Sequence, residues 1–434
     1  MTINGSRGDR TTRRDFLKGA TGIFAFPHFV SASAPGQSGG VVPSERTTMA
    51  CIGVGGRGRQ NMQSFMGHED CRVVAVCDVN AKRVEQARRM VDEHYGDTGC
   101  AAYGDYREVL ARDDIDAVSI ATTDAWHVLQ SVEAARTGKD IFLEKPLGLS
   151  VREDIALREA VRRYDRVFQF GTQQRSDRNF GFACELVQNG RIGTLRRIVA
   201  ATPASRAVGL VEPAPVPDWL DWKMWVGPAR WRPYSVGITG NCGEWGHISD
   251  FSLGWITTWG IHHVDIAQWG NDADHTGPVE VEGTGEFPAD GLYDCATAWD
   301  MTLRYANGVV LKFVDNRRHR QGVLFEGDDG WVFVKRGPIE AQPVSLLEER
   351  IGPDERHFTI GTDHWRGFLD CVRTRRTPVS SIESAVRTDT VCHLCDIAMR
   401  LGRKLRWDPS AERCVGDTQA DRMLARAWRS PWRL

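Results

Sequence analysis

The sequence predicts an α/β protein with two folded parts: an N-terminal Rossmann domain on a doubly wound parallel sheet, and a C-terminal α+β domain on a largely antiparallel open sheet. A glycine-rich turn after residue 49, followed by alternating strand and helix patterns to about residue 150, predicts the first part. Alternating apolar runs joined by glycine turns at 306–308 and 327–330 predict hairpins in the second. A length of 434 residues also favours two domains.

These patterns divide the chain into consecutive parts. They are a twin-arginine signal (1–34), a linker (35–48), the Rossmann domain (49–150), the α+β domain (151–410) with a tryptophan-rich insertion (202–256), and a C-terminal tail (411–434). We expect a final helix over 382–401 to close the second domain.

The N-terminus resembles an export signal rather than part of the fold. Arg13 and Arg14 form the arginine pair of a twin-arginine signal, and a moderately apolar segment and small residues at 31–34 follow. We therefore expect a periplasmic or otherwise extracytoplasmic protein. This route carries folded proteins, often with a cofactor already bound.

The composition excludes several classes of partner. A net charge of -2 gives no reason to expect nucleic acid or an anionic membrane surface, and no apolar run reaches the length of a membrane span. The eleven cysteines are scattered and do not suggest a disulfide framework. Cys392-His393-Leu394-Cys395 suggests a metal site, but no second Cys/His pair at ligand spacing accompanies it. We predict no metal.

The glycine-rich turn predicts a dinucleotide site. Gly53, Gly55 and Gly58 have the spacing G-x-G-x-x-G, which suits a tight turn, close approach to a pyrophosphate and close helix–strand packing. Asp78 ends the next apolar run, 20 residues past Gly58, where a carboxylate can accept hydrogen bonds from ribose hydroxyls and would repel a 2′-phosphate. This favours NAD, while Arg83 nearby keeps NADP as an alternative.

Polar residues at the ends of the predicted strands also point to this site. Asp78, Thr122–Asp124 and Glu144–Lys145 all fall where a strand of the parallel sheet ends. Ligands of such sheets bind at the carboxyl ends of the strands. We therefore expect these residues to share one cleft.

Tryptophan is concentrated in residues 202–270, which hold eight of the fifteen tryptophans in the chain. Packing in the core or in loops explains any one of them. Such a dense cluster in a Pro/Gly-rich region also suits stacking on sugar faces or a subunit interface. We expect a carbohydrate substrate and a homo-oligomer.

Three blocks together resemble the glucose–fructose oxidoreductase / inositol dehydrogenase (Gfo/Idh/MocA) family. They are Gly53–Gly58, Thr122-Thr-Asp-Ala-Trp-His127 and Glu144-Lys145-Pro146. The second block is similar to the family's Thr-Pro-Asn-x-x-His, with Asp124 in place of the asparagine. The resemblance continues at 260–265, which is similar to the family's Asp-x-Gly-x-His-x-x-Asp.

The resemblance implies roles for these residues. Lys145 would lie beside the nicotinamide and hold a substrate hydroxyl, and His262 would be the general acid/base, with His263 as its rival. The implied substrate-binding residues are Arg175, Thr258, His263 and Asp265. The implied cofactor-binding residues are Gly53, Gly55, Gly56, Arg57, Gly58, Asp78, Thr122, Asp124, His127, Glu144 and Lys145. Many relatives have an Asp where this chain has Thr258, so His262 would lack its usual carboxylate partner.

Three functions fit these observations. The first is an NAD(P)-dependent oxidoreductase acting on a sugar or sugar derivative. Because no nicotinamide pool exists outside the cytoplasm, its cofactor would be held tightly and recycled within each turnover. The second is an NAD-dependent glycoside hydrolase that oxidises its substrate transiently and then eliminates the glycosidic oxygen. The third is a non-catalytic NAD-binding protein.

Overall fold

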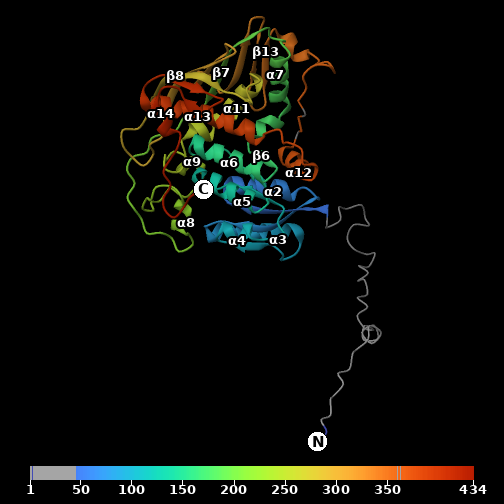
Figure 1. The fold of residues 1–434 in the computed structure, drawn as a ribbon, viewed down its shortest axis with the longest axis vertical. Coiled ribbons are helices and arrows are strands. Elements are labelled where there is room, and N and C mark those ends of the chain that lie inside the picture. The colour runs from blue at the N-terminus through green and yellow to red at the C-terminus, as the bar shows by residue number, and fades with distance from the viewer. Residues whose placement is uncertain (1, 3–44, 359, 362) are drawn as a thin grey trace. The chain divides into compact units, whose positions relative to one another are not determined.

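The computed structural model describes residues 2, 45–358, 360, 361 and 363–434 (Figure 1). The predicted export signal and the linker up to residue 44 lie outside this part of the chain. Among the described residues, no helix is long and apolar enough to cross a membrane.

The first sheet confirms the predicted Rossmann architecture. Within the described residues it has six parallel strands in the order β3-β2-β1-β4-β5-β6. The strands are β1 (Thr47–Ile52), β2 (Cys71–Cys77), β3 (Ala101–Tyr103), β4 (Ala117–Ile120), β5 (Asp140–Leu143) and β6 (Phe168–Phe170). Its helices are α2 (Gly56–Met66), α3 (Ala81–Tyr95), α4 (Tyr106–Leu110), α5 (Asp124–Arg136) and α6 (Val151–Arg163). The sheet therefore continues to Phe170, past the predicted boundary at residue 150, because β6 pairs with β5.

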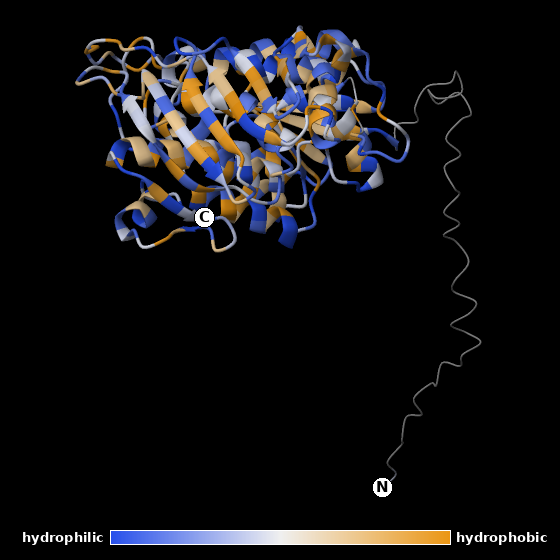
Figure 2. Cartoon of the chain, turned by 90° about the horizontal axis from the view of Figure 1, so that it is seen from above, coloured by the Kyte–Doolittle hydropathy of each residue, from blue (hydrophilic) through white to orange (hydrophobic). Residues whose placement is uncertain are grey.

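The second sheet is largely antiparallel, as predicted. Its nine described strands run in the order β13-β12-β11-β7-β10-β9-β8-β14-β15, and among them only β7 and β10 pair in parallel. They are β7 (Leu195–Thr202), β8 (Pro278–Glu286), β9 (Ala298–Tyr305), β10 (Val310–Asp315), β11 (Gly322–Gly327), β12 (Trp331–Val334), β13 (Ile339–Gln342), β14 (Leu405–Asp408) and β15 (Arg413–Cys414). Hydrophobic and hydrophilic residues alternate along its strands (Figure 2), as expected for a sheet with one buried face.

Helices fill the space between the two sheets. Those nearest the second sheet are α7 (Arg178–Gln188), α11 (Gly260–Gly270) and α13 (Ile382–Leu401) (Figure 1). α13 packs against α6 and α11, and one continuous apolar core runs from the Rossmann strands to the second sheet. Outside the tryptophan-rich insertion and the C-terminal tail, the other described helices are the α-helix α12 (His364–Thr374) and the 3₁₀ helices η2 (Gln173–Ser176) and η3 (Val344–Glu348).

The tryptophan-rich insertion has a small core of its own, into which Trp222, Trp225 and Phe251 pack. Its helices are α8 (Trp222–Val226), α9 (Cys242–Trp245) and, at its end, α10 (Trp255–Thr258). Trp222 and Trp225 stack on each other with ring centroids 4.9 Å apart. These two rings are therefore part of the core and not free platforms for a sugar.

The predicted C-terminal tail is also folded. It contributes β15 and α14 (Thr418–Met423), and the ring of Trp432 packs edge-on against Trp126 of α5 at 4.7 Å. Arg429 donates hydrogen bonds to the carbonyls of Gly227 and Lys223 in the insertion, at 2.7 and 3.1 Å. The end of the chain thus ties the insertion to the Rossmann domain.

Candidate functional site

A cleft of about 1030 Å³ lies at the carboxyl ends of β1, β2, β4 and β5. The structure brings nearly all the predicted cofactor-binding residues together there: Gly53, Gly55, Gly56, Arg57, Asp78, Thr122, Asp124, His127, Glu144 and Lys145 line it. Gly58 is absent from the lining. Parallel strands explain this convergence, because their carboxyl ends meet along one edge of the sheet.

The glycine loop fits a dinucleotide. Gly53 has φ +80°, and a Cβ there would lie 2.6 Å from the carbonyl oxygen of Ala121. A Cβ on Gly58 would lie 1.8 Å from the carbonyl oxygen of Gly53, so helix α2 can pack this closely only with glycine. Gly56, by contrast, has open space where its Cβ would be. The backbone at the start of α2 is therefore exposed to the cleft and can approach a pyrophosphate.

Asp78 is fixed by backbone donors at the next strand end. Its Oδ2 accepts from the N–H of Val54 at 3.0 Å, and its Oδ1 from the N–H of Asn80 at 2.9 Å. Burial raises the pKa of Asp78, while the charge of Arg83 opposes that rise. Because a carboxylate oxygen accepts more than one hydrogen bond, both oxygens can still receive ribose hydroxyls.

Arg83 is already engaged by the insertion. Its Nη2 donates to the carbonyls of Thr239 and Gly240, at 2.9 and 2.6 Å. The guanidinium thus holds the insertion beside the cleft while it also belongs to the cleft lining. The carboxylate of Asp78 is the feature that favours NAD over NADP.

Glu144 and His127 position Lys145. The buried Oε1 of Glu144 accepts from Asn61 Nδ2 and Gln173 Nε2, both at 3.1 Å. His127 Nδ1 lies 2.6 Å from the carbonyl oxygen of Pro146, and burial lowers the pKa of His127 to about 4, so the neutral ring donates this hydrogen bond. Both neighbours of the lysine are therefore fixed, and its half-buried side chain faces the cleft.

His262 comes from α11, and the charge of Lys145 influences its pKa. Burial, followed by the charges of Lys145 and Arg336, lowers the pKa of His262 well below its usual value. Its side chain is 1% exposed, and its Nδ1 has no protein partner among the described residues. A neutral imidazole with a free nitrogen is suited to accept a proton. His262 itself does not line the cleft.

The four predicted substrate-binding residues are occupied elsewhere. Arg175 forms short hydrogen bonds with both oxygens of Asp265, at 2.7–2.9 Å, and pairs with Asp274 at 2.7 Å. His263 Nδ1 bonds the carbonyl oxygen of Ala201 at 2.9 Å, and Thr258 Oγ1 lies 3.1 Å from Ser252 Oγ. None of the four lines the cleft. Their polar groups are thus hydrogen-bonded to neighbouring side chains or to the backbone, and a role of these residues in binding substrate stays a prediction.

Asp124 has an environment that the sequence did not predict. It is buried at the start of α5, and burial raises its pKa from 3.8 to about 7, against the effects of the Ser252 hydroxyl and the charge of Lys145. Ser252 in turn contacts Thr258. Asp124 thus adds a buried carboxyl group to the lining of the cleft.

The insertion covers the other side of the cleft. Met224, Trp225, Asn241, Cys242 and Trp245 line it together with the cofactor-binding residues. Trp126 Nε1 donates to the carbonyl of Met224 at 2.9 Å, and Lys82 Nζ lies 4.8 Å from the ring centroid of Trp219. The density of tryptophans was the only sequence signal for this cover. It did not indicate that the insertion would fold back onto the Rossmann domain.

Comparison with known families agrees with this geometry. The Gfo/Idh/MocA model described as "Oxidoreductase family, NAD-binding Rossmann fold" matches residues 47–172. The model of that family's "C-terminal alpha/beta domain" matches residues 206–434.

Curated relatives match about a third of the chain. An α-N-acetylgalactosaminidase of Shewanella oneidensis is 33% identical over 159 residues, which is 32% of this chain and 35% of the relative. The uncharacterized oxidoreductase YrbE of Bacillus subtilis is 32% identical over 156 residues, which is 35% of this chain and 43% of the relative. The matches therefore span less than half the length of either relative.

Solved structures share the fold over most of the chain. An aldose–aldose oxidoreductase from Caulobacter crescentus, complexed with glycerol, has a TM-score of 0.62 at 19% identity, covering 83% of this chain and 99% of that one. The WlbA dehydrogenase from Bordetella pertussis, in complex with NADH and UDP-GlcNAcA, has a TM-score of 0.61 at 16% identity, covering 84% and 99%. At these identities the likeness establishes the fold.

Proposed function

The chain belongs to the Gfo/Idh/MocA family of NAD-binding oxidoreductases, and from that premise we propose that it transfers hydride between a sugar or sugar derivative and an NAD that stays bound throughout turnover. The observation that carries this proposal is the cleft itself. It joins the glycine loop and Asp78 to Lys145, and the charge of Lys145 acts on His262 of the second domain.

The residues divide the work between holding the cofactor and moving a proton. Bound NAD supplies a hydride acceptor at the nicotinamide. The Lys145 ammonium holds the substrate hydroxyl and favours its ionisation. Neutral His262 accepts the hydroxyl proton at its free nitrogen, because its lowered pKa keeps it unprotonated at neutral pH. Asp124 adds a buried carboxyl group to the lining that also contains Lys145.

Retention of the cofactor follows from the cover on the cleft. The insertion is held against the Rossmann domain by Arg83 and Trp126, and Arg429 holds it from the C-terminal side. Release of NAD would require these contacts to open. Together with the predicted twin-arginine export, for which Arg13 and Arg14 are the support, this favours an extracytoplasmic enzyme that recycles its own cofactor.

The test is the absorbance of the purified enzyme at 340 nm. Enzyme prepared without added NAD should release NAD on denaturation, and its absorbance at 340 nm should rise when an oxidisable sugar is added alone. Lys145→Ala should still contain NAD but lose turnover by about 10²–10⁴. Lys82→Ala, a lysine outside the cleft lining, is the matched control. If Lys145→Ala turns over like wild type, the assigned role is wrong.

A second function, redox-neutral glycoside hydrolysis, has one specific observation in its favour. Relatives at 33–36% identity over 159 residues are named α-N-acetylgalactosaminidase or glycosyl hydrolase family 109 protein. Oxidation of a sugar at C3 acidifies the proton on C2, so the glycosidic oxygen can leave by elimination, and reversal of the oxidation after water addition restores NAD. The same Lys145 and His262 would serve the oxidation step.

A further inference from the structure

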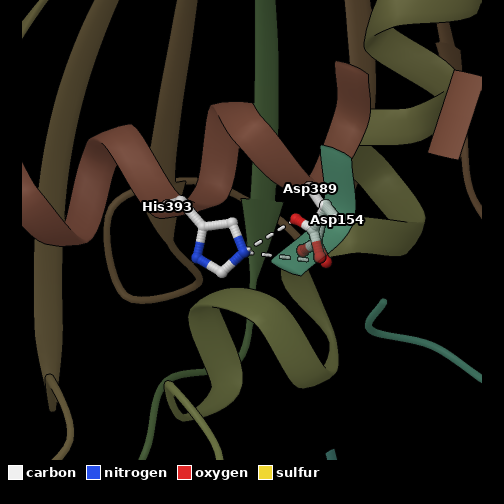
Figure 3. A group of neighbouring side chains, drawn as sticks. All are labelled: Asp154, Asp389 and His393. Atoms are coloured by element: carbon white, nitrogen blue, oxygen red, sulfur yellow. Dashed lines mark hydrogen bonds and ion pairs between the residues drawn. The ribbon is translucent and has the colours of Figure 1, made fainter. Parts of the chain in front are cut away.

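Three ionisable side chains meet between α6 and α13, away from the cofactor cleft. Figure 3 shows the imidazole of His393 facing the carboxylates of Asp154 and Asp389. His393 Nε2 lies 3.1 Å from Asp154 Oδ2 and 3.8 Å from Asp389 Oδ2. One ligand-type atom from each residue lies within 4.8 Å of the other two.

This group, Asp154, Asp389 and His393, is almost completely buried. Both carboxylates are 0% exposed and the imidazole is 2% exposed. Asp154 Oδ1 and Asp389 Oδ1 have no hydrogen-bond partner among the described residues. Burying an ionised carboxylate without compensation is expensive, so two such oxygens in one place call for a positive charge or a proton.

The surrounding protein does not supply that charge. Glu153, beside Asp154, is a further buried carboxylate, and it accepts from the N–H of Leu149 at 2.8 Å. The guanidinium of Arg158 forms a bidentate pair with Glu412 at 2.7 Å, so it is committed to another acid. With both carboxylates ionised, the cluster would therefore carry more negative charge than His393 alone can balance.

We propose that Asp154, Asp389 and His393 bind one divalent transition-metal ion, with Zn²⁺ or Mn²⁺ as the best match. A divalent ion neutralises the two carboxylates while leaving the imidazole neutral, as a ligand must be. Zn–N and Zn–O bonds of about 2.0–2.2 Å place tetrahedral ligand atoms roughly 3.3–3.5 Å apart. The separations of 3.1 and 3.8 Å bracket that spacing without a rearrangement of the backbone. Mixed imidazole and carboxylate donors suit these metals.

The ion would brace the chain that carries Lys145. Asp389 Oδ2 also accepts from the N–H of Leu147 at 2.8 Å, two residues after Lys145. The preceding residue, Thr388, donates to Asp265 Oδ1 at 3.2 Å, on the helix that carries His262. A metal at this position therefore stabilises the part of α13 that contacts both catalytic elements. Its role is structural, because it lies outside the cleft lining.

The histidine belongs to the Cys392-His393-Leu394-Cys395 segment, but the cysteines are not its partners. The metal-compatible group found among the described residues contains two aspartates and no cysteine. The ligands are instead Asp389 and His393 of α13 together with Asp154, which precedes them by more than 200 positions in sequence.

The test is the metal content of the full-length protein, purified without a polyhistidine tag and without chelators. Plasma mass spectrometry should find about one equivalent of zinc or manganese per chain, either as purified or after incubation with ZnCl₂ or MnCl₂ and removal of the excess. Asp389→Asn and His393→Ala should each lose that equivalent. Asp396→Asn alters another buried acid of α13, which pairs with Arg400 at 2.8 Å, and should keep it.

Two results would overturn the proposal. One is wild-type protein that holds less than a tenth of an equivalent after incubation with either metal, since the cluster would then be neutralised by a shared proton. The other is metal that persists at wild-type stoichiometry in both Asp389→Asn and His393→Ala, since the ion would then bind elsewhere. If those variants fold poorly, the melting temperature of the wild-type protein tests the proposal instead. A strong chelator should lower this temperature by several degrees, and added Zn²⁺ or Mn²⁺ should restore it. No change with chelator would again contradict a structural ion.

Discussion

Asp78 recognises the cofactor through a carboxylate that the backbone has already oriented. The N–H groups of Val54 and Asn80 fix its two oxygens. Charge-assisted hydrogen bonds to ribose hydroxyls contribute roughly 1.5–3 kcal/mol each. We expect Asp78→Ala to weaken NAD binding by more than about tenfold, measured by calorimetric titration of protein stripped of its cofactor. Unchanged affinity would remove Asp78 from the site.

His262 and His263 are adjacent in sequence but differ in what their nitrogens do. His263 is bonded to the carbonyl of Ala201, whereas His262 Nδ1 is free and close to the charge of Lys145. We therefore expect His262→Ala to lower kcat by about 10²–10⁴, with the fold intact by circular dichroism. His263→Ala should act mainly on stability. The reverse outcome would mean that the family motif is aligned one residue out of register.

Asp124 should make stability depend on pH. Its folded pKa of about 7 lies above the ordinary value of 3.8, so between about pH 4 and 7 the folded state holds a proton that the unfolded state has lost. Stability from this group is fully present below pH 4 and is lost as the pH rises towards 7. Asp124→Asn removes this dependence and should gain stability relative to wild type across that window, on the order of 1–4 kcal/mol.

Calorimetry of both proteins at pH 4.5, 6 and 7.5, with the cofactor removed, measures this difference. Melting temperatures that change in parallel would show that Asp124 titrates normally. Asparagine is also the residue of the family pattern at this position, so the variant should retain the backbone geometry of the start of α5.

At the scale of elements, the insertion is held by contacts that lie outside the cofactor cleft. Arg429 donates to Gly227 and Lys223, and its guanidinium lies 5.4 Å from the ring centroid of Trp231. Arg429→Ala should therefore speed the release of bound NAD several-fold without altering any residue that lines the cleft. Exposed Arg433 is the matched control, and Arg433→Ala should release NAD at the wild-type rate. Displacement of bound NAD by labelled NAD measures both rates, and equal rates would show that the cover does not limit release.

The sequence predicted the parts of this fold that are encoded locally. The spacing of Gly53, Gly55 and Gly58 and the position of Asp78 depend on short-range chain geometry, and the structure brings them into one cleft. The hairpins at Asn307-Gly308 and at 327–330 follow from turn chemistry in the same way.

Long-range pairing was not predictable. The family resemblance implied that Arg175 and Asp265 bind substrate, and it did not indicate that they pair with each other. Their mutual pairing depends on how η2 and α11 pack, which no local pattern records. The meeting of Asp154 with His393 across two helices was missed for the same reason.

At the scale of the whole molecule, α13 contacts both segments that carry the proposed catalytic residues, Lys145 and His262. It packs against α6 of the Rossmann domain and α11 of the second domain, and one apolar core includes residues of all three helices. Thr388 and Asp389 contact, respectively, the helix of His262 and the chain after Lys145. The distance between the lysine and the histidine is therefore set by a rigid element, so we expect the cleft to open through the insertion rather than through separation of the domains.

The cover on the cleft bears on how the oxidation state of bound NAD is restored. A cofactor that does not exchange must return to its starting state within each turnover, whichever of the two proposed functions applies. We therefore expect many turnovers without external NAD and without net accumulation of NADH, measured as product formed per enzyme-bound NAD. One-to-one consumption of freely exchanging NAD would instead identify a conventional dehydrogenase.

A lactone or sugar acid formed together with a reduced second sugar would indicate paired oxidation and reduction. Cleavage of a glycoside in deuterated water could also leave deuterium on the carbon next to the oxidised one. That result would indicate elimination, because only that route exchanges the acidified proton with water.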